Sequence, residues 1–322
     1  MSSYLSALGP APFTTAEARA VGITKRELRA LVGAGHLRRV LRGVYVDAAV
    51  PDALVVRAAA VAKAVPPGVA ACLRTAAWLW GVDALAMGAH REIPPVDVMA
   101  PSSSASPRRV GCAGRTGPLP DSDVVELMGV LVTTPARTAA DLLRLLRRPD
   151  ALASLDAMLR ETRVSKQVVA EVLARFARQR GVVQARQLLN LADGRSESPQ
   201  ESRTRLRCVD AGFPCPEPQI EVFDSCGGLL ARLDMGYRRL LRAIEFDGDV
   251  AHRTPSQLLH DQRRRAGVER EGWRLVVVTS EQVLSKGLTF EHAVAELLER
   301  EPRLTRDHPR YGGWDRRVPG GL

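Results

Sequence analysis

Two neighbouring segments near the C-terminus place acidic residues within patterns that are typical of β-strands. Residues 230–237 contain Asp234, and residues 240–248 contain Glu245 and Asp247. Because successive side chains of a strand point to opposite faces, Glu245 and Asp247 share one face of a predicted hairpin. Carboxylates that are packed together repel each other, so the cluster requires a nearby cation or raised pKa values. A divalent metal ion is the simplest cation that would satisfy it.

The acidic cluster lies in a strongly basic chain. The 322 residues carry a formal net charge of +10, and arginine far outnumbers lysine among the 46 basic residues. Arginine is suited to bidentate contacts with phosphate, and a pI near 10.0 favours a polyanionic partner. Codon usage in a GC-rich genome would explain the excess of arginine over lysine equally well, but it does not explain the net charge. We therefore expect DNA as a partner.

The sequence has no feature that is typical of a membrane or secreted protein. No run approaches the about 18 apolar residues of a membrane span, and residues 1–10 lack the basic and apolar regions of a secretory signal. The five cysteines are scattered and include no Cys-x-x-Cys pair, which favours reduced thiols. We expect a cytoplasmic protein of two or three domains without a membrane partner.

Residues 1–50 have the order of a winged helix-turn-helix domain. Thr14 and Thr24 are each followed three residues later by glutamate, which predicts two capped helices, and a basic hairpin around Gly43 comes next. In such a fold the first residues of the second helix enter the major groove of duplex DNA. An ordinary helical segment with a solvated basic face is the alternative. The residues that we predict to contact DNA are Lys25, Arg26, Arg29, Arg38, Arg39 and Arg42.

Residues 51–192 are predicted to form an α+β middle domain. Its clearest local signal is Thr134 followed by Pro135, which marks the N-cap and the first position of a helix. The segment contains no cluster with the spacing of a metal site or a nucleophile, so we interpret it as a scaffold or a partner-binding surface. A polar break at 193–199 begins the next domain, and residues 302–322 are predicted to be a flexible tail.

Residues 193–301 are predicted to form a mixed α/β domain with the element order α-βββ-α-β-α. This order and the residues on it resemble the PD-(D/E)xK nuclease superfamily, and most closely its Vsr-like branch, the DUF559 family. The resemblance covers about 190–300. It rests on Glu201, Asp234, the segment Glu245-Phe246-Asp247-Gly248, His252, Asp261, Arg264 and the segment Gly272-Trp273-Arg274.

The resemblance implies a restriction-endonuclease-like domain that cleaves phosphodiester bonds of DNA with Mg²⁺. Magnesium would be held by Glu201, Asp234 and Glu245. The catalytic residues would be Asp234, Glu245, Asp247 and His252. The residue types suit this chemistry, since a hard cation held by carboxylate oxygens activates water and stabilises charge on phosphate.

Two arginines and one departure from the family pattern complete the predicted site. Arg264 and Arg265 could contact the phosphate. Asp247 departs from the superfamily pattern, because many members have lysine at this position and an acid cannot stabilise developing negative charge as lysine does. Asp247 would instead bind a second metal ion or position water.

The candidate site residues also have simpler interpretations. Glu201 completes a capping box with Ser198, while Asp234 and Glu245 could be solvent-facing acids on an edge hairpin. His252 could be structural or merely exposed. A zinc site is disfavoured because its candidate ligands lack short chelating spacings; these ligands are Cys208, Cys215, Cys226 and His252.

The N-terminal half resembles a second family. Residues 14–46, ending in Leu-Arg-Gly-Val-Tyr-Val, resemble the winged-helix domain of AbiEi-type antitoxins, and residues 68–160 resemble the domain that follows it there. Residues 74–81 and 133–141 carry the second match. The resemblance implies that the first domain binds promoter DNA and that the second serves antitoxicity. A cognate toxin, or a second copy of the chain, would be a further partner.

Two functions therefore compete. The first is a DNA-binding, magnesium-dependent endonuclease that is guided by the winged helix. The alternative is a non-catalytic, antitoxin-like transcriptional regulator whose nuclease fold is degenerate. A third possibility, an RNA-directed toxin or antitoxin, is disfavoured because aromatic residues, which stack on unpaired bases, make up only 4% of the chain.

Overall fold

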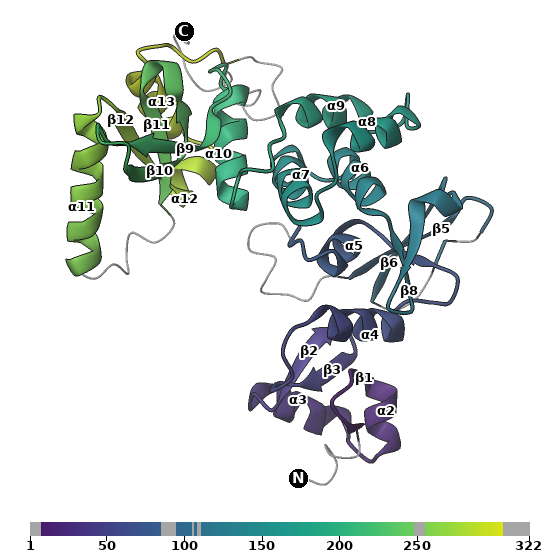
Figure 1. The fold of residues 1–322 in the computed structure, drawn as a ribbon. Coiled ribbons are helices and arrows are strands. Elements are labelled where there is room, and N and C mark those ends of the chain that lie inside the picture. The colour runs from purple at the N-terminus through teal and green to yellow at the C-terminus, as the bar shows by residue number, and fades with distance from the viewer. Residues whose placement is uncertain (1–7, 85–94, 105, 108–110, 248–254, 305–322) are drawn as a thin grey trace. The chain divides into compact units, whose positions relative to one another are not determined.

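The computed structural model describes residues 8–84, 95–104, 106–107, 111–247 and 255–304 (Figure 1). The fold is mixed α/β and contains three sheets. The chain divides into two compact units. The first comprises Met1–Leu146 and Met158–Leu189, and the second comprises Arg147–Ala157 and Asn190–Leu322.

The N-terminal part of the first unit has the predicted order of two helices and a hairpin. Both helices begin at a threonine whose side chain accepts the backbone N–H of a glutamate three residues later, and the glutamate returns the bond. The strands form an antiparallel sheet in the order β1-β3-β2. The elements are β1 (Phe13–Thr14), α2 (Thr15–Ala20), α3 (Lys25–Gly33), β2 (Leu37–Leu41) and β3 (Val44–Asp47).

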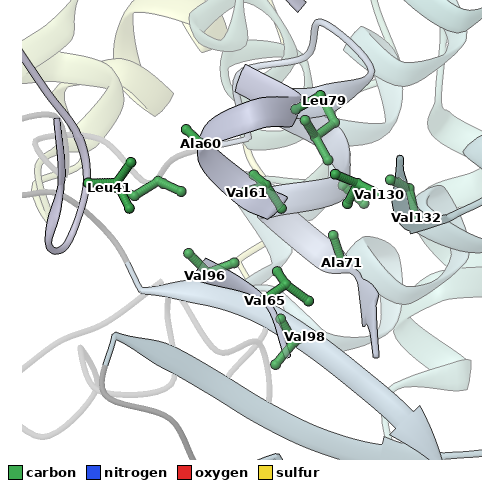
Figure 2. Packing of buried hydrophobic residues seen from close by; sticks show 13 residues of the cluster. Leu41, Ala60, Val61, Val65, Ala71, Leu79, Val96, Val98, Val130 and Val132 are labelled. Atoms are coloured by element: carbon green, nitrogen blue, oxygen red, sulfur yellow. The ribbon is translucent and has the colours of Figure 1, made fainter. Parts of the chain in front are cut away.

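The rest of the first unit surrounds a five-stranded sheet with the order β6-β5-β4-β8-β7. Figure 2 shows part of its core, in which small and branched apolar residues of the helix α4 and the strands pack together. The elements are α4 (Leu54–Ala64), β4 (Ala70–Ala71), α5 (Leu73–Leu79), β5 (Val96–Pro101), β6 (Cys112–Gly117), β7 (Val124–Leu127), β8 (Val130–Thr133) and α6 (Pro135–Leu145). As predicted, Thr134 caps α6 and Pro135 is its first residue.

Three further helices complete the region before the polar break: α7 (Arg148–Thr162), α8 (Lys166–Ala174) and α9 (Val182–Leu191). Helix α7 is divided between the two units, because residues up to Ala157 group with the second unit and residues from Met158 group with the first.

The second unit is built on a four-stranded sheet with the order β12-β11-β10-β9, in which only the β11–β12 pair is parallel. The predicted order α-βββ-α-β-α is present, with one additional short helix, α12. The elements are α10 (Pro199–Asp210), β9 (Glu217–Phe223), β10 (Leu229–Tyr237), β11 (Arg242–Asp247), α11 (Pro255–Arg270), β12 (Arg274–Thr279), α12 (Ser280–Leu284) and α13 (Thr289–Leu298).

Helices cover both faces of this sheet. Ile244 of β11 packs in a cluster with Phe290 of α13, whereas the preceding Ala243 packs in a separate cluster with Val268 of α11. Since neighbouring residues of a strand point to opposite faces, α13 and α11 lie on opposite sides of the sheet. Glu245 follows Ala243 by two positions and therefore points to the α11 side. Among the described residues, no helix is long and apolar enough to cross a membrane.

Candidate functional site

Helix α3 presents basic side chains at a firmly capped N-terminus. The Thr24 side chain accepts the backbone N–H of Glu27 at 3.2 Å, and the Glu27 carboxylate accepts the Thr24 N–H at 2.7 Å. The Thr24 hydroxyl also donates to the Glu27 carboxylate at 2.7 Å, and this bond, followed by the one from the Thr24 N–H, lowers the pKa of Glu27. Leu28 is 1% exposed and anchors the helix in the small core of Phe13, Ala18, Ile23 and Leu37. The cationic residues of the helix, Lys25, Arg26 and Arg29, are all exposed.

Not all of the predicted arginines of the basic hairpin are exposed, in contrast to the basic residues of α3. The backbone N–H of Thr15 donates to the Gly43 carbonyl at 3.0 Å, which ties the hairpin turn to the start of α2. Arg39 and Arg42 are exposed, but Arg38 is half-buried and donates to the Val50 carbonyl at 3.2 Å. Five of the six predicted DNA-contacting residues are therefore exposed. The sixth, Arg38, is half-buried and also stabilises the fold through its bond to Val50.

The structure brings Asp234, Glu245 and Asp247 to one pocket, whereas Glu201 does not line it. The pocket has a volume of about 300 Å³ and lies at the ends of β10 and β11 beside α11. Its lining residues are Arg232, Asp234, Glu245, Phe246, Asp247, Arg264, Arg265 and Val277. The clustering of carboxylates that strand alternation predicts is thus present, together with both arginines that were expected to contact phosphate.

Asp234 and Glu245 of this pocket already have hydrogen-bond partners. Asp234 accepts the backbone N–H of Phe246 at 2.8 Å. Both oxygens of Glu245 accept from the Arg264 guanidinium, at 2.7 Å to Nη1 and 3.1 Å to Nη2. Burial raises the pKa of Asp234 to about 6 against the lowering effect of the Phe246 N–H, and the charges of Glu201 and Glu245 add to the rise.

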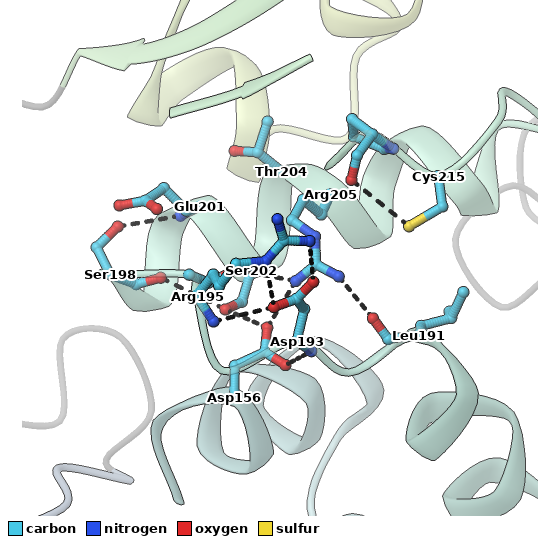
Figure 3. Close-up of polar contacts among 12 residues, drawn as sticks. Asp156, Leu191, Asp193, Arg195, Ser198, Glu201, Ser202, Thr204, Arg205 and Cys215 are labelled. Carbon is cyan, nitrogen blue, oxygen red and sulfur yellow. Dashed lines mark hydrogen bonds and ion pairs between the residues drawn. The ribbon is translucent and has the colours of Figure 1, made fainter. Parts of the chain in front are cut away.

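Glu201, the third predicted metal ligand, performs other tasks. Only half of the predicted capping box is present: the Glu201 backbone N–H donates to the Ser198 side chain at 3.1 Å, but the Glu201 carboxylate bonds to other groups. This carboxylate accepts from Gln219 at 2.8 Å and from the backbone N–H of Glu197 at 3.0 Å. These bonds hold Glu201 at the N-terminus of α10, where Figure 3 shows it beside Ser198.

The donor set does not fit a metal site in this arrangement. Nowhere in the part of the chain that the structure describes do three His, Cys, Asp or Glu residues form a group that could hold a metal ion. Arg264 already occupies both oxygens of Glu245, and Glu201 is held by amides. His252 lies outside the described residues. Magnesium binding and the catalytic roles stay predictions.

The sequence did not indicate how many arginines of the second unit are internal. Arg203, Arg205 and Arg207 of α10 are 7%, 2% and 1% exposed. Their guanidinium groups pair with acids from distant segments, namely Asp150 at 2.9 Å, Asp156 at 2.9 Å and Glu291 at 2.7 Å. Figure 3 shows the Asp156 carboxylate between Arg205 and the side chain of Ser202. One signal was available: charges at every second position of a helix cannot all face solvent.

The first unit contains a comparable buried network. Arg137, 1% exposed, donates to Asp123 at 2.6 Å and to Asp141 at 2.7 Å. Its guanidinium carbon lies 5.0 Å from the ring centre of Phe176, and that of Arg144 lies 3.9 Å from the same ring. Arg137 and Asp141 belong to the segment 133–141 that carries the antitoxin resemblance, so in this structure their role is to hold the fold together.

Comparison with known proteins settles the family. The chain is 35% identical over 279 residues to two proteins of Mycobacterium tuberculosis, the uncharacterized protein MT2308 of strain CDC 1551 / Oshkosh and the uncharacterized protein Rv2248 of strain ATCC 25618 / H37Rv. The alignment covers 86% of this chain and 98% of each relative. Residues 5–46 match the family described as "Transcriptional regulator, AbiEi antitoxin", and residues 69–191 match the "AbiEi antitoxin C-terminal domain".

The chain belongs to one family with these mycobacterial proteins and carries both AbiEi antitoxin-type domains. The predicted resemblance of the N-terminal half to AbiEi-type antitoxins is thus confirmed. The AbiEi matches end at residue 191, before the carboxylate pocket. The likeness of the following domain to nucleases therefore stays a prediction.

Proposed function

We propose that this protein is a DNA-binding transcriptional regulator of the AbiEi antitoxin type, and that helix α3 contacts duplex DNA. The observation that carries the proposal is the exposure of Lys25, Arg26 and Arg29 on a capped helix within the matched regulator domain. The first residues of the second helix of a helix-turn-helix domain reach base edges in the major groove. Leu28 and the capping box fix the helix, so the cations are held in place before DNA binds.

A toxin is the second partner in this proposal. The domain at 69–191 matches the C-terminal domain of AbiEi antitoxins, and an antitoxin requires a toxin that it opposes. We place this role on the first unit because the matched segment lies almost entirely within it.

The DNA-binding proposal is tested by fluorescence anisotropy with a labelled duplex from the region upstream of the protein's own gene. The variant Lys25→Ala/Arg26→Ala/Arg29→Ala is compared with Arg180→Ala/Arg186→Ala/Arg239→Ala, which removes the same charge from exposed positions elsewhere. We expect the α3 variant to bind weakly and the control to bind almost as the wild type does. Each phosphate contact that is lost reduces the slope of log K against log salt concentration by about 0.9. Equal affinities of the two variants would reject α3 as the contact surface.

A metal-dependent DNA endonuclease is the second candidate function. It is supported by the pocket in which Asp234, Glu245 and Asp247 lie beside Arg264 and Arg265. In this proposal the carboxylates bind Mg²⁺ after Arg264 has left Glu245, and the arginines contact the phosphate. Plasmid DNA incubated with the protein and Mg²⁺ provides the test. Nicking that disappears with EDTA, with Asp234→Ala and with Glu245→Ala would support the enzyme. Intact plasmid, together with salt-sensitive DNA binding, would reject the endonuclease and support the regulator.

A further inference from the structure

The cation of the carboxylate pocket is supplied by the chain itself. Arg264 places one guanidinium nitrogen on each oxygen of Glu245, at 2.7 Å and 3.1 Å. The side chains of Arg264 and Glu245 are 27% and 11% exposed, so water screens the pair only in part. Such fork-shaped, charge-assisted pairs are among the stronger hydrogen-bonded contacts in proteins.

The position of Arg264 is fixed by packing. It belongs to α11, and one turn later Val268 of the same helix is fully buried against a cluster that includes Ala243 and Trp273. Ala243 and Glu245 lie two positions apart in β11 and thus share the face that α11 covers. The helix that closes this face of the sheet therefore also brings the guanidinium to Glu245.

A dication at the same carboxylates would meet unfavourable conditions. Mg²⁺ and Mn²⁺ bind carboxylate oxygens, and here both oxygens of Glu245 already accept bonds from a positive group. Two like charges within a few ångströms of one carboxylate repel each other, and the repulsion is strong where the surroundings are partly desolvated. Asp234 also has one oxygen, Oδ2, engaged by the Phe246 N–H.

We propose that Arg264 is the resident cation of this pocket and that it excludes small divalent cations from Glu245 and Asp234 in the folded protein. The inference concerns the second unit alone and does not depend on DNA binding by α3. It also states a condition for the endonuclease candidate, since metal can enter only where Arg264 is displaced. Without Arg264, both oxygens of Glu245 lose their guanidinium partner and become available to Mn²⁺ or Mg²⁺ beside Asp234.

The test is thermal unfolding of the full-length protein in EDTA, in MgCl2 and in MnCl2, with Mn²⁺ binding measured in parallel by titration calorimetry. Arg264→Met keeps an unbranched, flexible side chain and removes the guanidinium and its charge. Arg263→Met is the matched control, because Arg263 is the exposed neighbour on the same helix and does not line the pocket. The double variant Arg264→Met/Glu245→Gln removes both partners.

We expect no metal-dependent shift of Tm for the wild type or for Arg263→Met. Arg264→Met is expected to unfold at a lower temperature in EDTA and to recover at least about 2 °C in Mn²⁺, with measurable Mn²⁺ binding. The double variant should lose this response, because the neutral amide neither requires nor attracts a cation.

Two results would overturn the proposal. The first is Mn²⁺ binding by the wild type that is as tight as binding by Arg264→Met. The second is a folded Arg264→Met protein, with a native circular dichroism spectrum, that does not respond to Mn²⁺. Should Arg264→Met not fold, Arg264→Gln replaces it, since it also removes the charge and keeps a polar side chain at this partly exposed position. The same gain of Mn²⁺ binding is expected, and its absence counts against the proposal.

Discussion

Helices α3 and α10 both carry closely spaced basic residues, yet they use them in opposite ways. On α3, Lys25, Arg26 and Arg29 are exposed at the helix surface. On α10, the arginines at positions 203, 205 and 207 are buried and each is paired with an acid. The comparison shows that the number of arginines overstates the number of possible DNA contacts. Each of these three pairs contains one positive and one negative charge, so together they contribute nothing to the net charge of +10.

The strongest test of this contrast is Arg207→Ala. Arg207 donates to both oxygens of Glu291 and to the Gln282, Ser285 and Gly287 carbonyls. Its loss leaves a buried carboxylate without a compensating charge. We therefore expect the free energy of unfolding to decrease by about 3–5 kcal/mol. Urea unfolding of the full-length protein measures the change. Replacing both partners, as in Arg207→Leu/Glu291→Leu, should recover much of the loss. A single variant as stable as the wild type would show that the pair does not hold the fold.

The second test uses pH. Burial raises the pKa of Asp156 to about 6, although Arg205 and Ser202 oppose the rise. The folded protein thus retains a proton that the unfolded chain releases near the ordinary pKa of 3.8. The contribution of Asp156 to stability therefore falls as pH rises from about 4 to about 6, by roughly 1–3 kcal/mol.

Asp156→Asn provides the reference for this measurement, because asparagine does not titrate. The free energy of unfolding of the wild type, minus that of the variant, should decrease between pH 4 and pH 7. A difference that is flat or increases would mean that Arg205 keeps Asp156 ionised throughout.

The third test concerns the cap of α3. Thr24→Ala removes the oxygen that accepts the Glu27 N–H and should cost about 1 kcal/mol of unfolding free energy. Thr24→Ser keeps the oxygen and should cost less. Binding of the upstream duplex should weaken in Thr24→Ala as well, since the first turn carries Lys25 and Arg26. Unchanged stability and affinity in Thr24→Ala would show that the helix end is held by packing alone.

The smallest effect on stability is expected where the effect on DNA binding is largest. Lys25→Ala, Arg26→Ala and Arg29→Ala should each change the free energy of unfolding by less than about 0.5 kcal/mol, because the side chains are exposed. Thermal unfolding beside the anisotropy measurement separates the two properties. A loss of several kcal/mol in any of these variants would place that residue in the fold, as Arg207 is on α10.

Local signals in the sequence predicted local structure well. The capping boxes at Thr14 and Thr24 and the N-cap at Thr134 are all present, because a cap is formed by residues three positions apart. Strand alternation likewise placed Asp234, Glu245 and Asp247 at one pocket.

Ion-pair partners that lie far apart in the sequence could not be predicted. Glu245 is paired with Arg264, 19 residues away, and Arg207 is paired with Glu291, 84 residues away. Which acid a buried arginine meets depends on how the helices pack on the sheet, and that packing leaves no local pattern. The helix α12 was missed for a different reason. Its N-cap, Thr279, is also the last residue of the apolar strand β12, so the strand signal obscured the capping box that Thr279 forms with Gln282.

The division of α7 has a consequence for dissecting the protein. A fragment that starts at the polar break, residue 193, would lack Asp150 and Asp156 and would leave Arg203 and Arg205 with no acid to neutralise them. Any C-terminal piece meant to be expressed alone should therefore begin before Arg148, even though this removes residues from the matched antitoxin domain. In any natural rearrangement of the gene, the first part of α7 would likewise have to remain joined to the C-terminal domain.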